Sequence, residues 1–285
     1  MGTVNTIVYK EEWAIKLQEE LDEPLKWKEI CNVEYTDGYV FHNPYITDAS
    51  VASISRGTAY TLQEVTQTDE SVTINGGSVL GQFIDRADLA QSGYLKQMEL
   101  ATRQGILLNE AIESAVLGAY ASMTDFGTEN LAGSAGSNQI TVSATNIDDI
   151  IRSVKRTIRT ANGESEMNRR GVFIVWRPAD FEILEGFMQA NGFVTADTAL
   201  KGGSQQGMDY MGVTHYSSNL LTANHLVGGV KKGIHLGICK GTYGQIMVDD
   251  KDPGLKSGIS VVSRVDYAVK IWAKIKTCVF DINVA

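Results

Sequence analysis

Residues 94–123, YLKQMELATRQGILLNEAIESAVLGAYASM, carry the strongest secondary-structure signal in the sequence. Apolar residues recur at steps of three and four along this stretch, which is the pattern of an amphipathic helix. At 1.5 Å per residue the helix would be roughly 43 Å long, well beyond the length of an average globular helix. Because Gly105 and Gly118 each lower the intrinsic helicity by about 1 kcal/mol, packing must hold this helix in place.

The residues that follow indicate both helices and strands. We expect a Gly- and Ser-rich loop at 126–138. An amphipathic helix should then begin at the candidate N-cap Asn146 and run to Ile158. The continuous apolar run Val172–Trp176 predicts a strand that is buried on both faces.

The remainder is predominantly of β type. Pro178 favours the first turn of a helix at 179–190, and a loop-like segment covers 193–210. Short strands are expected from Met211 onward, followed by a long β-type run at 259–284 that needs a bend because it is too long for one strand. The sequence therefore predicts an α+β fold.

The N-terminal part resembles an arm more than a domain. Residues 10–30 are acidic and only loosely helical, and Pro24 interrupts them. Trp13 and Trp27 need a surface on which to be buried. That surface belongs either to a neighbouring copy or to the same subunit, and the sequence leaves both open.

Residues 56–92 predict a polar β-hairpin. The segments Thr68–Ser71 and Asn75–Gly77 are turn signals between β-type residues. Two strands with little hydrophobic bulk are marginally stable by themselves in water. The hairpin should therefore lie against another surface, for which another subunit is one candidate.

Composition excludes several classes of protein. The chain has 285 residues, of which 43% are hydrophobic and 21% are charged, with 28 Gly and 4 Pro. This composition is that of a globular protein and excludes a disordered tail, a collagen-like repeat and a Pro-rich linker. Its formal net charge is −9 and its pI is near 5.0, which disfavours tight direct binding to DNA. Charge is also uneven, since residues 10–37 are acidic and residues 251–276 are basic, a distribution that suits association between copies but also fits two solvated faces.

No arrangement for catalysis, cofactor binding or metal binding is found. The sequence lacks a nucleophile elbow, a zinc-protease motif, a phosphate loop and a dinucleotide fingerprint. The acidic stretch Asp249–Gly254 lacks the glutamate that closes a calcium loop, so an acidic turn fits it better. The cysteines form no CxxC pair and predict reduced thiols, and the histidines lack metal-ligand spacing; these residues are Cys31, Cys239, Cys278, His42, His215, His225 and His235.

Targeting signals are also missing. The N-terminus turns acidic within about a dozen residues, unlike a signal peptide, and it does not fit the N-myristoylation pattern. No apolar run approaches the roughly 18 residues of a membrane helix. We therefore expect a soluble protein that is made in a cytoplasm and has no membrane partner.

The order of these elements resembles the major capsid proteins of tailed bacteriophages, the Hong Kong-type or Johnson capsid fold. The segment Phe83–Ser92 followed by Tyr94 looks like the family's approach to the spine helix. Val172–Pro178 and Gly212–Leu220 are similar to strands of its axial domain. The resemblance covers nearly the whole chain, although its motifs are short.

The resemblance implies a division of the chain into four parts. Residues 1–50 would be the N-terminal arm and 51–93 the extended loop, a β-hairpin. The peripheral domain would comprise 94–145, with the spine helix at 94–123, and also 249–285. Residues 146–248 would be the axial domain.

The implied function is structural and not enzymatic. Copies would assemble into hexamers and pentamers of an icosahedral shell that encloses double-stranded DNA without sequence-specific binding. The resemblance also implies a scaffolding protein, a portal and decoration proteins as partners, and a place in the virion after assembly in the host bacterial cytoplasm.

Two departures from the family pattern carry expectations of their own. Some family members carry a long N-terminal scaffolding segment that is cleaved, whereas here the arm begins almost at Met1, so we expect that the chain is either already mature or relies on a separate scaffolding protein. Some family members join subunits covalently through a lysine of the extended loop, whereas residues 56–92 contain no lysine. We therefore expect no cross-link of that kind.

Two alternatives remain open at this stage. An encapsulin-type nanocompartment shell has a similar fold and encloses protein cargo. An unrelated α+β enzyme would show a deep pocket with clustered, strongly shifted titratable groups.

Overall fold

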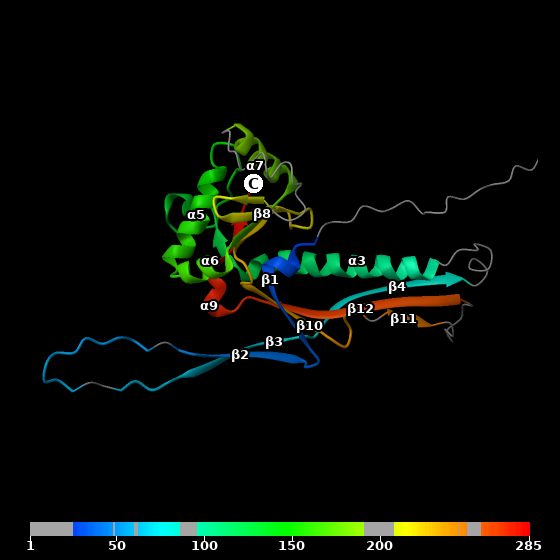
Figure 1. The fold of residues 1–285 in the computed structure, drawn as a ribbon, viewed down its shortest axis with the longest axis horizontal. Helices are drawn as coiled ribbons and strands as arrows, with labels where there is room; N and C mark the ends of the chain where they lie inside the picture. The colour runs from blue at the N-terminus through cyan, green and yellow to red at the C-terminus, as the bar shows by residue number, and fades with distance from the viewer. Residues whose placement is uncertain are drawn as a thin grey trace, which may run out of the picture.

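A computed structural model describes residues 25–47, 49–59, 62–85, 96–190, 208–244, 246–249 and 258–285 of the chain (Figure 1). Its helices are α1 (Trp27–Ile30), α3 (Lys96–Leu117), the 3-10 helix η1 (Gly118–Ser122), α4 (Thr128–Ala132), α5 (Ile147–Thr160), α6 (Glu164–Arg170), α7 (Pro178–Ala190) and α9 (Ala273–Lys276). Its strands are β1 (Cys31–Thr36), β2 (Val40–Ile46), β3 (Gln67–Thr73), β4 (Gly77–Asp85), β5 (Thr124–Phe126), β6 (Val172–Trp176), β7 (Met208–Tyr210), β8 (Val213–Ser217), β9 (His225–Val230), β10 (Ile234–Cys239), β11 (Ile246–Asp249), β12 (Gly258–Lys270) and β13 (Val279–Asn283).

A six-stranded mixed sheet forms the centre of one half of the molecule. Its strand order is β5-β13-β9-β6-β8-β7, in which β6 is parallel to β8 and antiparallel to β9. All five residues of β6 are buried. Val172, Ile174 and Trp176 face the hydrophobic core that contains α5, whereas Phe173 and Val175 belong to a second core on the other face. The apolar run at this position therefore serves two cores at once.

The second half is an elongated sheet with α3 lying along it (Figure 1). Its order is β1-β10-β12-β11, and β4 also pairs with β12. The long strand β12 pairs with β4 over Gly258–Asp266 and with β10 over Tyr267–Lys270, antiparallel in both cases. The side chain of Gln104 on α3 is fully buried against this sheet, where it donates to the Val261 carbonyl (3.1 Å).

A two-stranded hairpin, formed by β2, the loop after it and β3, projects from the body (Figure 1). The strands are antiparallel and pair from Val40 with Thr73 to Ile46 with Gln67. After β3 the chain turns into β4 at Gly77, where a Cβ atom would lie 1.9 Å from the Val265 carbonyl oxygen. Only glycine allows β4 to approach β12 this closely.

The predicted hairpin was partly wrong in its boundaries. Its first strand is Val40–Ile46, which the sequence assigned to the N-terminal arm, and the expected turn Thr68–Ser71 lies inside β3. At the second expected turn, Asn75–Gly77, residues 74–76 are an irregular connection without an assigned turn, and Gly77 begins β4, which pairs with β12 and not with the hairpin. Short-range turn signals could not show that a strand from residues 258–266 would pair with β4 instead.

The N-terminal residues that the structure describes are not a free arm. Trp27 and Ile30 are fully buried in the second core, and β1 is an edge strand beside β10. Trp27 is therefore buried on its own subunit. Trp13 lies outside the described residues.

The other predicted elements are largely confirmed. The long helix is present as α3 and ends at Leu117, where η1 replaces its last turn. The helix after Asn146, the buried strand at 172–176 and the helix after Pro178 are all present. The C-terminal run is broken by α9, as its length required. The Asn146 side chain does not cap α5 but accepts a hydrogen bond from Ser143 N (2.8 Å), and the loop expected at 126–138 contains α4.

Besides the short helices α4 and α9, the sequence analysis missed α6. α6 is a short segment, ESEMNRR, whose one buried residue is Met167, so its apolar periodicity is too weak to detect from sequence. Of the segment expected as a loop at 193–210, residues 193–207 lie outside the described residues, and the expectation was wrong for Met208–Tyr210, which form β7.

Candidate functional site: the hairpin and the cavity at its base

The hairpin continues beyond β2 and β3 as a narrow pair of chains. Thr47 N donates to the Thr66 carbonyl (2.9 Å), and the Gln63 side chain bonds with the Ser50 N, O and Oγ atoms at 2.8–3.0 Å. A turn then closes where Thr58 N donates to the Ser55 carbonyl (3.1 Å) with Gly57 at φ +87°. A positive φ at the third position is the geometry that glycine favours in a type II turn.

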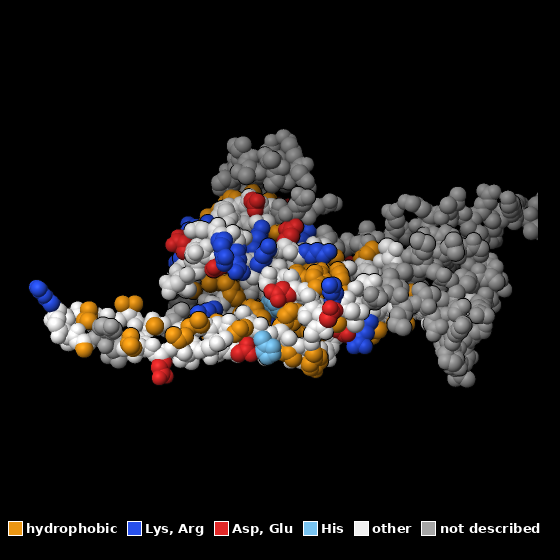
Figure 2. Space-filling view, turned by 60° about the horizontal axis from the view of Figure 1, so that its bottom comes forward, with side chains coloured by type: hydrophobic (Ala, Val, Ile, Leu, Met, Phe, Trp, Pro, Cys, Tyr) orange, Lys and Arg blue, Asp and Glu red, His pale blue; other side chains and the backbone are white. Residues whose placement is uncertain are grey.

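Aliphatic side chains are exposed along both chains of this loop. Val51 is 100% exposed, Leu62 83% and Val65 76%. In Figure 2 the hydrophobic side chains follow the protruding hairpin. A loop that exposes several aliphatic residues together is typical of a protein–protein contact surface.

Three contacts hold the base of the hairpin on the body. The Phe41 ring lies edge-on to the His235 ring (centroids 5.3 Å apart) and covers Gly237 of β10. Ala273 N donates to the Glu70 carboxylate (3.1 Å). Lys274 Nζ donates to the Ile46 carbonyl (3.3 Å) and lies over the Tyr45 ring. The hairpin is thus fixed through β10 and α9.

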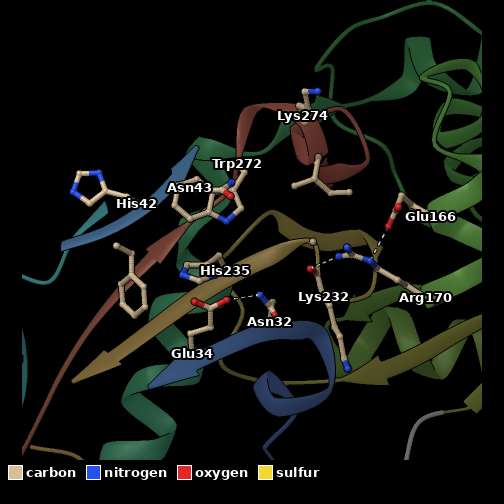
Figure 3. Close-up of a pocket in the computed structure, with 13 residues that line it drawn as sticks. Asn32, Glu34, His42, Asn43, Glu166, Arg170, Lys232, His235, Trp272 and Lys274 are labelled. Atoms are coloured by element: carbon tan, nitrogen blue, oxygen red, sulfur yellow. Dashed lines mark hydrogen bonds and ion pairs between the residues drawn. The ribbon is translucent and has the colours of Figure 1, made fainter. Parts of the chain in front are cut away.

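A cavity of about 440 Å³ lies beside this base, and we call it the basal cavity (Figure 3). Its wall includes aromatic and aliphatic groups, Phe41, Trp272 and Ile275, and polar groups, Asn32, Glu34, Asn43, Glu166, Arg170 and His235. Glu166 forms ion pairs with Arg169 (2.6 Å) and Arg170 (2.7 Å), and hydrogen bonding to Arg169 lowers the pKa of Glu166. Burial lowers the pKa of His235, so its imidazole is neutral at pH 7.

The structure brings two of the four histidines to this region and keeps the others apart. His235 lines the basal cavity and His42 lies on β2, where Nδ1 is 2.6 Å from the Asp69 carboxylate. His215 is buried among core residues, and His225 pairs with Asp281 (2.9 Å) and stacks on Tyr120. No cluster of three metal-ligating side chains occurs within the described residues.

The three cysteines are free thiols in the structure. Burial raises the pKa values of Cys31 and Cys278, so the reactive thiolate form of both is disfavoured. Of the acidic stretch Asp249–Gly254, the described part is Asp249, the last residue of β11.

No helix in the described ranges has an apolar stretch long enough to cross a lipid bilayer.

Sequence reasoning missed the basal cavity because its residues come from five separate parts of the chain. These parts are β1, β2, α6, β10 with the turn before it, and the segment from Trp272 into α9. The Asp37-Gly38 pair, a common hairpin turn signal, was the one local clue that β1 and β2 are separate strands.

Comparison with known proteins gives a clear result for structure and none for sequence. No protein-family model matches the chain, and no curated protein sequence matches it. The structure of Mycobacterium phage Che8 is similar with a TM-score of 0.71 and 17% identity, covering 98% of both chains. The capsid of the empty GTA particle has a TM-score of 0.71 and 14% identity, covering 97% of this chain and 95% of that one.

A virus-like particle from Pyrococcus furiosus is also similar, with a TM-score of 0.56 and 12% identity over 91% of this chain and 92% of that one. The similar structures are nearly all from phage capsids. Identities this low establish a shared fold, and they cover almost the whole chain. The chain therefore has the fold of tailed-phage capsid structures, as the order of its elements indicated.

Proposed function

We propose that this chain is a major capsid protein whose copies assemble into hexamers and pentamers of an icosahedral shell that encloses double-stranded DNA. The observation that carries the proposal is the projecting hairpin with its exposed Val51, Leu62 and Val65, on a chain that has the capsid fold over nearly its full length. Burying such side chains against a second copy would remove apolar surface from water. A net charge of −9 suits a shell that encloses DNA without adhering to it.

The parts of the chain follow from the same proposal. α3 would be the spine helix, the axial domain would be built around β6 and α5, and the peripheral domain around α3, β4 and β12. The extended loop would be residues 40–73, and the N-terminal arm would be the residues before α1. Scaffolding, portal and decoration proteins would be its partners, and the virion its final location.

The experiment is negative-stain electron microscopy of the purified chain after size-exclusion chromatography at several salt concentrations. Closed shells, or rings of five and six, are expected. A 31 kDa monomer at high concentration, even with scaffolding protein added, would contradict the proposal.

The similarity to the virus-like particle from Pyrococcus furiosus favours a second candidate, a nanocompartment shell of the encapsulin type that holds protein cargo. The contents of purified shells separate the two. Copurifying DNA or a portal supports the phage shell, whereas a copurifying enzyme supports the nanocompartment.

A further inference from the structure

The far end of the hairpin carries a single basic side chain. Arg56 is the second residue of the turn that Ser55 and Thr58 close, and it is exposed. It is the one Lys or Arg among the described residues of this loop, and Figure 2 shows one basic group at the hairpin's end. Within the described part of the chain, Arg56 forms no ion pair.

One acidic side chain of the basal cavity, Glu34, forms no ion pair within the described residues. The Glu34 carboxylate is exposed and accepts one hydrogen bond, from Asn32 Nδ2 (3.4 Å), and no cation pairs with it within the described ranges. In Figure 3 it lies beside the neutral His235 ring, with Trp272 on the cavity wall. Trp272 is partly exposed and its ring centroid is 5.0 Å from that of His235.

The basic residues of the cavity are directed elsewhere. Arg170 is held by Glu166 and by the Lys232 carbonyl (2.9 Å). Lys274 reaches the Ile46 carbonyl and the Tyr45 ring. The Lys232 side chain points away from Glu34 in Figure 3. A carboxylate beside an amide side chain, with an indole ring on the wall of the same cavity, is suited to bind a guanidinium group.

A chain cannot place its own Arg56 in its own basal cavity. Phe41 lines the cavity, and 15 residues of extended chain separate it from Arg56, which amounts to about 50 Å at 3.3 Å per residue. Hydrogen bonds between the two chains of the hairpin keep it extended over this distance. The side chain is therefore available to a second copy.

We propose that Arg56 of one copy binds in the basal cavity of a second copy, with Glu34 as its counter-ion and the Trp272 ring beside it. This inference rests on the proposed self-assembly, and it identifies one pair of residues through which two copies would bind each other. Because the two ends of the contact are different surfaces, it is head-to-tail, and repeating it either closes a ring or extends a chain of subunits. The hairpin length then helps to set the spacing between neighbours.

Charge reversal tests the pair. Arg56→Glu and Glu34→Arg are each expected to raise the concentration at which half of the chain assembles by at least about tenfold, because each places like charges together. The double variant with both reversals should bring this concentration back to within about threefold of the original chain. Glu64→Arg, a reversal on the same loop away from its end, is the matched control and should assemble normally.

An effect of these variants on assembly is distinguished from an effect on folding by measuring both properties for each variant. Circular dichroism and thermal unfolding of the unassembled variants should match the original chain, because both residues are exposed. Normal assembly of Arg56→Glu, or single reversals that the double variant does not rescue, would overturn the Arg56–Glu34 contact and leave the shell proposal intact. Failure of the original chain to assemble would instead contradict the proposed function.

A second measurement does not depend on charge. In a chain with both Arg56→Cys and Glu34→Cys, a thiol-specific cross-linker about as long as an arginine–glutamate pair should convert assembled material to a ladder of covalently linked multimers on a denaturing gel. Glu34→Cys alone should give none. Absence of the ladder from assembled double-cysteine material would refute the contact.

Discussion

The Trp176 indole Nε1 donates a hydrogen bond to His215 Nδ1 at 2.9 Å, inside the core between β6 and β8. Nδ1 is therefore an acceptor, and the proton resides on Nε2, which faces the Tyr210 carbonyl at 3.3 Å. Burial lowers the pKa of His215 from 6.5 to about 4. The imidazole is neutral in the folded chain across the physiological range.

This pair predicts a stability that depends on pH. The unfolded chain takes up a proton on His215 below pH 6.5, whereas the folded chain does so only near pH 4, so the free energy of unfolding falls as the pH falls through this window. The loss amounts to about 3 kcal/mol over the window. Denaturant unfolding of unassembled chain at pH 7, 6, 5 and 4.5 measures it.

Two variants serve as controls, and for each the slope of the free energy of unfolding against pH is measured. His215→Gln removes the titrating group and should flatten the pH dependence, whatever it does to the stability at pH 7. Ser217→Ala, on the same strand, should keep the original slope. An unchanged slope in His215→Gln would show that other groups cause the acid sensitivity.

Trp27 anchors the first described residues on the body. It is fully buried, and its backbone N–H and that of Lys26 both donate to the Glu113 carboxylate of α3. Trp27→Ala should lower the free energy of unfolding by about 3–5 kcal/mol. Tyr39→Ala, at a side chain that is 65% exposed, should change it by less than about 0.5 kcal/mol. Equal stability of both variants would mean that Trp27 is buried by another copy.

Gly237 determines how the hairpin lies on the sheet. A Cβ at this position would lie 2.3 Å from the Phe41 ring, so Gly237→Ala should displace the base of the hairpin. Hydrogen exchange of residues 40–46 should speed up, and Phe41→Ala in the same chain should relieve the clash. Gly186→Ala is the control because nothing lies within 4 Å of its added methyl group. Unchanged exchange in Gly237→Ala would argue that the contact does not fix the hairpin.

The exposed aliphatic side chains of the loop should affect assembly and not folding. Val51→Ser combined with Leu62→Ser should leave the free energy of unfolding of the unassembled chain within about 0.5 kcal/mol, since both residues are exposed. The assembled fraction should fall at a given concentration, because less apolar surface is buried. Sedimentation measures the fraction, and Ser55→Ala on the same loop provides the control. Shells that form equally well from the double variant would show that this loop stays solvated.

Shells of this protein should not be joined covalently through the hairpin. The sequence has no lysine between Lys28 and Lys96, so the hairpin offers no amine for an isopeptide bond. Boiled shells should run as a single band near 31 kDa on a denaturing gel. A ladder of multimers under reducing conditions would contradict this expectation.

Sequence patterns predicted the elements whose burial can be recognised within one continuous segment. The periodicity of α3 and α5 and the apolar run of β6 reflect burial of one helix face or of both strand faces, which a single segment reveals. Sequence patterns failed at the hairpin, where Val40–Ile46 includes Pro44 and its apolar and polar residue types do not alternate, although the burial of its residues does. Pro44 is tolerated because β2 pairs with β3 alone.

The basal cavity could not be predicted for a similar reason. Glu34 and Trp272 are 238 positions apart in the sequence, with His235 between them, and no local pattern indicates that the three meet. Their proximity follows from the parallel pairing of β1 with β10 and from the bend that places α9 beside them. Such non-local pairings are fixed only by the whole fold.

The path of residues 258–283 has a consequence for protein synthesis. β12 completes the elongated sheet between β4, β10 and β11, and β13 lies between β5 and β9 in the other sheet. Both strands leave the ribosome after every element with which they pair, so neither sheet is complete until residues 258–283 have been translated. A nascent chain that has exposed the hairpin but lacks residues 258–283 has neither sheet complete, so we expect any association between copies to follow the translation of these residues.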